Sequence, residues 1–223
     1  MFHVGNDIVD LTNPRSRKKV DDVRFINRVL AAEEQGQLLR SDHPFEILWS
    51  FWAGKETAYK ICRKLDLRAA FSPRLYRIRF HDPEESHERK NDFLNVKALN
   101  GTVSTKCGVI HIRVVIRPDF VHCVGTEDPS SLGMVAWEWD RLKNPAPDND
   151  TSLFVRKMAV KGLSDWSGQR SEDIEIKRFK GVKGLGPPLV YIKGEPSGID
   201  ISLSHDGPFC AYAFSRQGSG QKV

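Results

Sequence analysis

The sequence predicts an α+β protein made of two similar halves. Apolar residues recur at helical spacing over residues 21–65, whereas the rest of the chain is mainly short runs in which apolar and polar residues alternate. A faint internal repeat supports two halves, because residues 71–80, leading to 119–128, resemble residues 170–179, leading to 198–207. In each copy, a strand of alternating charge precedes a buried strand that ends in small polar residues.

The first elements are a strand and two helices. Residues 3–11 have a strand-like apolar pattern that a Gly-Asn-Asp stretch interrupts. Residues 21–40 have the apolar spacing of a helix that begins at two aspartates, and residues 44–65 predict a longer helix that begins near Pro44.

The later elements are mostly strands, separated by polar loops such as residues 81–92. The alternation of apolar and polar residues, together with Gly, Pro and Asn turn signals, identifies them. We expect strands at 74–80 and 119–128, a hairpin over 96–116 that turns at Asn100-Gly101, a helix at 153–163, a strand at 171–179, a Gly/Pro turn and strand over 182–194, and two strands over 198–214 that meet at Ser204–Pro208.

Composition and charge are those of a globular protein with an acidic partner. Hydrophobic residues make up 39% and charged residues 28% of 223 residues, and no apolar run approaches the roughly 18 residues of a membrane span. The start of the chain lacks the pattern of a secretory signal, and four scattered cysteines without CxxC spacing predict reduced thiols in a cytoplasmic protein. The net charge of +5 suits an acidic protein, a nucleic acid or a polyphosphate ligand.

Gly5-Asn6-Asp7 places a carboxylate where the first strand is expected to break. A carboxylate that projects from a sheet edge can bind a hard cation. Asp10 lies three residues on and would face away from Asp7 on a regular strand. An Asx turn without any ligand is the alternative interpretation.

Glu56 and Lys60 share a face of the aromatic-rich helical stretch "WSFWAGKETAYKI", residues 49–61. If this helix packs beside the strand of Asp7, two carboxylates would bind Mg²⁺, with water and substrate phosphates completing the coordination. Lys60 would then reach a phosphate oxygen. The alternative is an ordinary stabilising Glu-to-Lys pair on a solvated helix face.

Ser204 and His205 lie in "SLSHDG", residues 202–207, after a buried strand and before a glycine. Hydroxyl, imidazole and backbone N–H groups at a strand end can hold a phosphate. A serine hydrolase is a weak interpretation because the G-x-S-x-G elbow is absent. A turn without a ligand is the alternative.

These three patterns, in this order, resemble those of the 4′-phosphopantetheinyl transferases. The stretch from Trp52 to Lys60 matches the helix motif W-x-x-K-E-(A/S)-x-x-K, and "GNDIVDL", "RFINRVLAAEE" and "KETAYKI" look most like the small holo-acyl-carrier-protein synthases. The resemblance covers residues 1–65 and 171–214 well and residues 80–150 poorly.

The resemblance implies transfer of the phosphopantetheine arm of coenzyme A to a serine of an apo acyl or peptidyl carrier protein, leaving adenosine 3′,5′-bisphosphate. It implies that Asp7 and Glu56 bind Mg²⁺ and that Glu56, or a water it orients, deprotonates the serine. Lys60, Ser204 and His205 would hold phosphates of coenzyme A. Asp10 has a supporting role only, and Lys55 belongs to the motif without a clear ligand contact.

The resemblance also bears on how the chain is organised. Larger family members carry a second acid where this chain has Val9, so we expect two protein ligands and more water on the metal, as in the small type. The faint repeat favours a fused pair of halves, related by a pseudo-two-fold axis in one monomer, over a trimer of small-type chains with an insertion at 80–150. The expected segments are a first half at 1–128 with the metal acids, a linker at 129–150, a second half at 151–216 with the Ser-His turn, and a tail at 217–223.

The expected partner is an acidic acyl carrier protein. Arg24 and Arg28 occupy the helix that docks the carrier in the small-type enzymes, and Arg15 precedes it. Solvated helix charges are the alternative for these arginines. The main rival function is a non-catalytic relative that binds coenzyme A or carrier. A nucleic-acid-binding protein is less favoured, because the basic residues are spread out and no aromatic-basic motif accompanies them.

Overall fold

The computed structural model describes residues 2–81, 97–142, 148–181 and 184–215 and confirms the α+β class. Its elements are β1 (Val4–Asp10), α1 (Pro14–Arg17), α2 (Val23–Val29), α3 (Ala32–Leu39), α4 (Pro44–Leu65), β2 (Arg77–Phe80), β3 (Lys97–Thr105), β4 (Gly108–Ile116), β5 (Phe120–Thr126), β6 (Val135–Arg141), α5 (Asp148–Ser167), β7 (Ile174–Lys177), β8 (Lys180–Gly181), β9 (Gly184–Leu185), β10 (Leu189–Ile192), β11 (Glu195–Asp206) and β12 (Phe209–Ser215). Every described helix is too short or too polar to cross a membrane.

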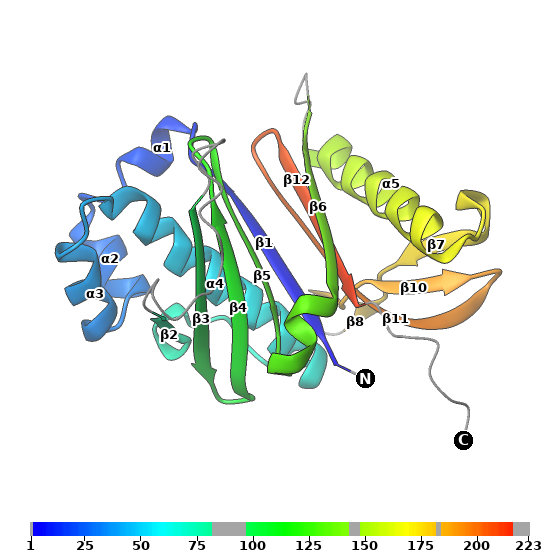
Figure 1. Ribbon diagram of the computed structural model, residues 1–223, viewed down its shortest axis with the longest axis horizontal. Coiled ribbons are helices and arrows are strands. Elements are labelled where there is room, and N and C mark those ends of the chain that lie inside the picture. The colour runs from blue at the N-terminus through cyan, green and yellow to red at the C-terminus, as the bar shows by residue number, and fades with distance from the viewer. Residues whose placement is uncertain (1, 82–96, 143–147, 182–183, 216–223) are drawn as a thin grey trace.

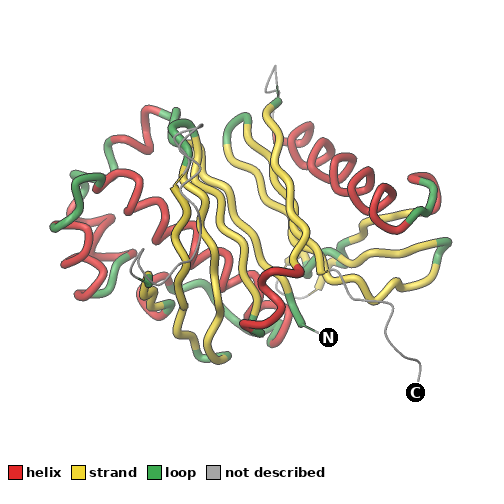
Figure 2. The backbone as a smooth tube through the Cα atoms, in the orientation of Figure 1, coloured by secondary structure: helices red, strands yellow, loops and turns green. Residues whose placement is uncertain are grey.

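Two five-stranded antiparallel sheets form the centre of the molecule (Figure 1). The first has the order β1-β5-β4-β3-β2 and the second the order β6-β12-β11-β10-β7. Figure 2 shows the long helices on the outer sides, with α4 against the first sheet and α5 against the second. This arrangement confirms the expected two halves, and it leaves β1 at the edge of the first sheet, beside β11 and β12 of the second.

The helical prediction is correct for α4, which begins at Pro44 as expected, and wrong in one detail before it. Residues 21–40 form two helices, α2 and α3, because Leu30 and Ala31 are extended between them. The Glu34 side chain accepts the Ala31 N–H at 2.7 Å and so starts the second helix. The apolar spacing alone does not reveal this interruption.

The predicted hairpin turn at Asn100-Gly101 is wrong, because both residues lie inside β3 and pair with β4. The chain turns at Lys106 and Cys107 instead, just before Gly108, whose φ is +114°. Gly101 is required for a different reason: a Cβ there would stand 2.7 Å from the Arg79 carbonyl oxygen on β2. The glycine therefore allows two strands to approach closely rather than forming a turn.

The expected strand break at Asp7 is also wrong, because β1 pairs with β5 along its whole length. Gly5 is instead needed for the close approach of α4, since a Cβ on it would lie 2.3 Å from the Thr57 carbonyl oxygen. Likewise, Ser204 and His205 lie within β11 rather than in a turn, and only residues 207–208 connect β11 to β12.

The predicted linker at 129–150 needs a correction as well. Its central part is β6, which pairs with β12 and forms an edge of the second sheet. The Pro, Asn and Asp residues that predicted a linker follow this strand, and residues 143–147 among them lie outside the described residues. Most of the predicted loop at 81–92 and the predicted tail at 217–223 also lie outside the described residues.

A buried ion pair fixes α4 against its neighbours. Lys55 is fully buried, and its Nζ donates to Glu34 Oε1 at 2.8 Å and Oε2 at 2.7 Å. It also donates to the carbonyl oxygens of Pro73 and Tyr76, and Glu34 in turn accepts the Ile78 N–H of β2 at 2.7 Å. Burial lowers the pKa of Lys55, and the charge of Glu34 opposes that change. Lys55 therefore orients the helix and is turned into the core.

This network yields a stability prediction. Glu34→Leu removes the anion that neutralises Lys55, and breaking one side of a buried pair costs about 3–5 kcal/mol. Urea unfolding should show that loss of unfolding free energy, and Lys55→Met on the same background should restore part of it. Glu33→Leu is the matched control on the exposed face of α3 and should change stability little. A small effect of Glu34→Leu would contradict this account of how α4 is held.

Candidate active site

The candidate site forms where β1 lies between α4 and β11. Alternate side chains of a strand point to opposite faces, so Gly5 and Asp7 face α4. Ile8 packs on the opposite side, against the second sheet. One face of β1 thus directs Asp7 toward α4, and the other face packs against the second half.

Side-chain atoms of β11 bind main-chain atoms of β1. Because β1 is an edge strand, alternate N–H groups have no partner in its own sheet. They donate at 2.6–3.0 Å to carboxylate and hydroxyl oxygens of β11. The pairs are Val4 with Asp200, Asn6 with Ser202, and Asp10 with Asp206, each 196 residues apart. The constant separation shows that β1 and β11 run side by side in the same direction.

Asp7, Lys60 and Glu56 come together as the sequence predicts. Lys60 Nζ lies 2.9 Å from Asp7 Oδ1 and donates to the Asn6 carbonyl oxygen at 2.7 Å. Burial, and after it the negative charge of Asp7, raise the pKa of Glu56 to about 7, although the charge of Lys60 opposes both effects. Burial also raises the pKa of Asp7, against the charge of Lys60. Two carboxylates therefore share a poorly solvated place with one ammonium group.

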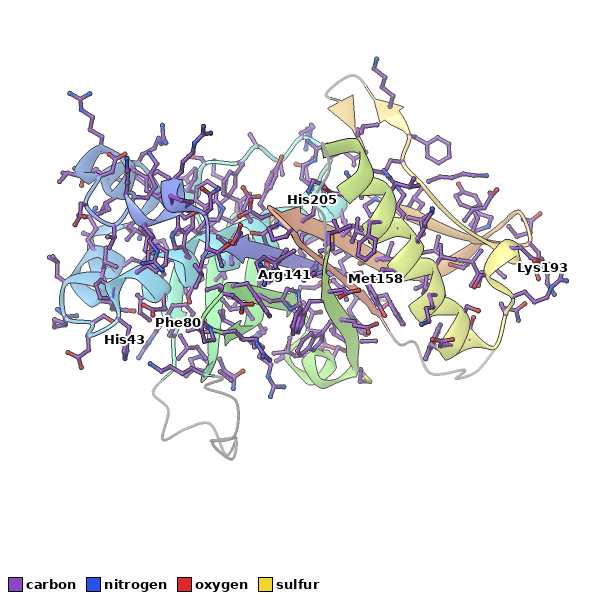
Figure 3. The ribbon with its side chains drawn as sticks, turned by 90° about the horizontal axis from the view of Figure 1, so that it is seen from above. His43, Phe80, Arg141, Met158, Lys193 and His205 are labelled. Carbon is purple, nitrogen blue, oxygen red and sulfur yellow. The ribbon has the colours of Figure 1, made fainter. Side chains whose placement is uncertain are left out.

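Ser204 and His205 are brought to the same region but point different ways. Ser204 is buried, and its Oγ accepts a hydrogen bond from Asn6 Nδ2 at 3.2 Å. His205 is exposed at the junction of the halves (Figure 3). Its positive charge lowers the pKa of Asp7, although less than burial raises it, so the imidazole lies near that carboxylate. Of the predicted pair, His205 is the residue exposed on the side of the acids.

Asp206 is an acid of this region that the sequence analysis missed. Its Oδ2 accepts the Asp10 N–H at 2.9 Å. Burial raises the pKa of Asp206, and the charges of Asp10 and Asp7 raise it further. The Oδ1 of Asp10 accepts from the N–H and hydroxyl of Thr12 at 2.8 and 2.6 Å. The Asp-Gly pair after His205 was the available signal for Asp206, and it was interpreted only as part of a turn.

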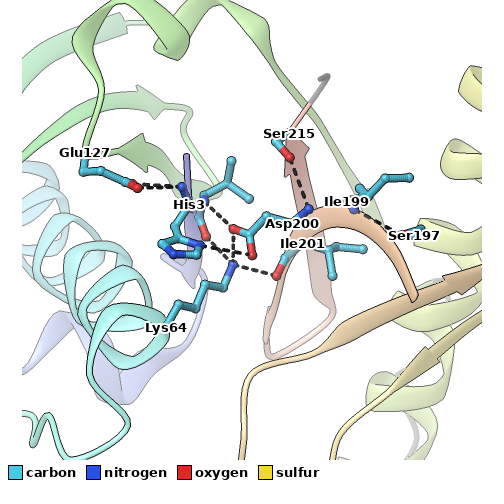
Figure 4. A network of polar contacts seen from close by, with 9 residues as sticks. His3, Lys64, Glu127, Ser197, Ile199, Asp200, Ile201 and Ser215 are labelled. Carbon is cyan, nitrogen blue, oxygen red and sulfur yellow. Dashed lines mark hydrogen bonds and ion pairs between the residues drawn. The ribbon is translucent and has the colours of Figure 1, made fainter. Parts of the chain in front are cut away.

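A second charged network joins the halves one helical turn away (Figure 4). Lys64 Nζ donates to Asp200 Oδ2 at 2.7 Å and to the carbonyl oxygens of Val4 and Ile201 at 2.6 and 2.8 Å. His3 Nδ1 lies 3.6 Å from Asp200 Oδ1. Burial raises the pKa of Asp200, but the charge of Lys64, the neighbouring His3 and the hydrogen bonds from Lys64 and the Val4 N–H outweigh it and hold the pKa below its usual value. Asp200 is thus a buried carboxylate anion with cationic partners.

A cavity of about 640 Å³ opens beside this network. One wall includes Arg63 and Lys64 at the C-terminal end of α4 and Arg68 just after it, and the other includes Phe179 and Pro187. Apolar rings opposite cationic side chains suit a ligand that has both a flat apolar part and phosphates. The sequence analysis treated the Gly-Pro turn at residues 186–188 as scaffold and did not find this cavity.

The cavity and the acids lie at successive positions along α4 and the start of the chain. Lys60 follows Glu56 by one turn of α4, and Lys64 in the cavity wall follows Lys60 by another, a rise of about 6 Å each. His3, just before β1, borders the cavity, and Asp7 lies four residues on, about 13 Å away. These separations are within the length of one extended ligand.

No group of three or more His, Cys, Asp or Glu side chains within the described residues is arranged to hold a metal ion. Asp7 and Glu56 nevertheless fit a hard cation, because both are oxygen donors in a poorly solvated place and the charge of Asp7 disfavours ionisation of Glu56. Mg²⁺ commonly takes one or two protein carboxylates and obtains its other ligands from water and phosphates. A site with two protein carboxylates would match this coordination preference.

The three predicted partner-binding arginines are exposed on the outer helices. Arg15 lies in α1, and Arg24 and Arg28 lie in α2 beside Val23, which is 66% exposed. The guanidinium of Arg28 lies 5.7 Å from the centre of the Phe25 ring. This arrangement forms a basic surface with an apolar residue in it.

The comparison with protein families identifies the first half. Residues 3–105 match the family model ACPS, the 4′-phosphopantetheinyl transferase superfamily. A search of curated proteins found no match. The matched segment contains Asp7, Glu56 and Lys60, whereas Ser204 and His205 lie outside it. The match confirms the resemblance over residues 3–105, and the general reaction of that family is transfer of phosphopantetheine from coenzyme A to a carrier protein.

The electrostatics of the two acids can be tested directly. In metal-free protein, Asp7→Asn should lower the pKa of Glu56 from about 7 toward its usual value of 4.5 without reaching it, because burial is the largest cause. Lys60→Met should raise that pKa instead. A carbon-13 NMR titration of the side-chain carboxyl groups measures both changes, with the exposed Asp165→Asn as control. An unchanged Glu56 titration in both variants would show that the three groups are not close neighbours.

Proposed function

We propose that this chain, which belongs to the 4′-phosphopantetheinyl transferase superfamily, transfers the phosphopantetheine arm of coenzyme A to a serine of an acidic apo acyl carrier protein, with Mg²⁺ and with release of adenosine 3′,5′-bisphosphate. The observation that carries the proposal is the cluster of Asp7, Glu56 and Lys60, which lies one to two turns of α4 before the cavity-lining Lys64. The finer assignment to the holo-acyl-carrier-protein synthase type rests on the motifs of the first half.

Coenzyme A fits the path from the cavity to the acids. Its adenine would lie near Phe179 and Pro187, and its phosphates would face the cations of α4. The pyrophosphate would then reach Lys60 and His205. Ser204 would act on the phosphates only indirectly, because its hydroxyl lies inside the interface and accepts a hydrogen bond there.

In the proposed reaction, Glu56 takes the proton of the carrier serine, directly or through a water that it orients. A pKa of about 7 suits a general base at neutral pH. The serine oxygen forms a bond to the β-phosphorus, the bond from this phosphorus to the bridging oxygen breaks, and adenosine 3′,5′-bisphosphate leaves with the electron pair. Lys60 and His205 hold the phosphate oxygens during this exchange. When bound by Asp7 and Glu56, Mg²⁺ would neutralise charge on the pyrophosphate.

A monomer accounts for both sides of this site. The first half contributes Asp7, Glu56 and Lys60, and the second contributes His205 and the ring-lined wall of the cavity. Because one chain contains both sides, no second copy is needed to complete the site. The carrier would approach over the basic surface of Arg15, Arg24 and Arg28.

The transfer reaction is tested by intact-protein mass spectrometry. An apo acyl carrier protein mixed with this enzyme, coenzyme A and Mg²⁺ should gain one phosphopantetheine arm. The gain should disappear with chelator and should fall at least a hundredfold in Glu56→Gln, because the general base is lost. No gain across several carriers, with coenzyme A still bound, would favour a non-catalytic relative that binds coenzyme A or carrier.

Carrier docking is tested by reversing a charge away from the acids. Arg24→Glu should slow transfer to the carrier about tenfold at low salt, and less at high salt, because rim charges act mainly on association. Coenzyme A binding, measured by calorimetry, should be unchanged. Lys161→Glu reverses an exposed charge on α5 of the other half and should leave transfer as in the wild type. Equal effects of the two variants would count against this docking surface.

A further inference from the structure

Asn6 connects the two halves next to the proposed catalytic acid. It is fully buried, and its main-chain N–H donates to Ser202 Oγ at 3.0 Å. Its Nδ2 donates to Ser204 Oγ at 3.2 Å and lies 3.4 Å from His122 Nε2. Its carbonyl oxygen accepts from Lys60 Nζ at 2.7 Å. Asn6 therefore contacts both α4, through Lys60, and β11, the strand that carries His205.

This polar contact lies between two apolar clusters on the same face of β1. One cluster surrounds Val4 and the other surrounds Ile8, and both pack against the second sheet. Apolar contacts are non-directional, so the alignment of β11 on β1 depends on the polar contacts, which are the main-chain bonds to Asp200, Ser202 and Asp206 and the side-chain bond of Asn6 to Ser204. Hydrogen bonds from a buried amide are directional, and a buried polar group of this kind can fix register.

Stability alone does not account for this polar contact. Asn6 Oδ1 and His122 Nδ1 are buried without a hydrogen-bond partner within the described residues. A partly satisfied polar group is less favourable inside a protein than an apolar side chain of similar size. Residues that break this rule are commonly found where function requires a particular geometry.

The position of His205 follows from the contact of Ser204. Successive side chains of β11 point to opposite sides, so a Ser204 hydroxyl held by Asn6 inside the interface directs His205 outward. His205 is then close enough to Asp7 for its charge to act on that carboxylate. A slide of β11 by one residue would exchange the two side chains.

We propose that Asn6 is a positioning residue, whose side chain holds Ser204 of β11 against β1 and so places His205 beside Asp7 for binding of the coenzyme A phosphates. This inference rests on the proposed function, because it takes coenzyme A as the ligand. It adds to that function a residue that touches neither substrate but aligns the two halves of the site.

The test is a double-mutant cycle between Asn6→Leu and His205→Ala, measured as the Kd of coenzyme A by calorimetry and as the transfer rate. Asn6→Leu removes only the side-chain hydrogen bonds, because the main-chain bond to Ser202 is kept. We expect Asn6→Leu to weaken coenzyme A binding about tenfold, the effect of one to two hydrogen bonds, with the Tm unchanged or raised. His205→Ala should then have little further effect in the Asn6→Leu background, because His205 is already misplaced.

Ile8→Val is the matched control for packing. It removes one methyl group from the same face of β1 and should leave the Kd and the transfer rate as in the wild type. Ser204→Ala supplies the same disruption from β11, should Asn6→Leu fail to fold. Additive effects of the Asn6 or Ser204 variant and His205→Ala, or a wild-type Kd in Asn6→Leu, would overturn the positioning role while leaving the transferase proposal intact. A wild-type protein that neither binds coenzyme A nor transfers its arm would overturn both.

Discussion

The edge of β1 is the constraint on which the rest of the structure depends. An edge strand has a row of N–H groups without partners, which natural proteins must cover. Here β11 covers it with side chains, through the carboxylates of Asp200 and Asp206 and the hydroxyl of Ser202. Because these bonds reach β1 from side chains, the two sheets remain separate and a cavity can open between them.

The helix α4 connects this arrangement to the candidate site, because it carries the charged side chains. Glu34 holds Lys55 of this helix in the core. Three charged residues then follow at intervals of four toward the cavity, namely Glu56, Lys60 and Lys64. Gly5 allows the helix to lie against β1 at a distance that any larger residue would prevent. The spacing of the acids is therefore set by close main-chain packing and does not depend on flexible surface loops.

Like charges are concentrated at this junction, which is unfavourable for the folded state. The pKa values of Asp7, Glu56 and Asp206 are all raised by burial, and neighbouring acids add to the shift for Glu56 and Asp206. Lys60 relieves part of this repulsion. A site that holds several poorly solvated carboxylates is suited to a hard cation, since its positive charge would offset the repulsion that the fold retains.

The sequence by itself determined the α+β class, the helix from Pro44, and the group of Asp7, Glu56 and Lys60, because helical spacing and short motifs are local properties. Local signals were misleading where a glycine serves a distant strand, as at Gly101. The places of Asp200 and Asp206 and the proposed role of Asn6 depended on contacts across 196 to 198 residues, which no local pattern encodes. Only the tertiary structure could decide them, because pairing the edge of β1 with β11 requires both halves to be folded and placed side by side.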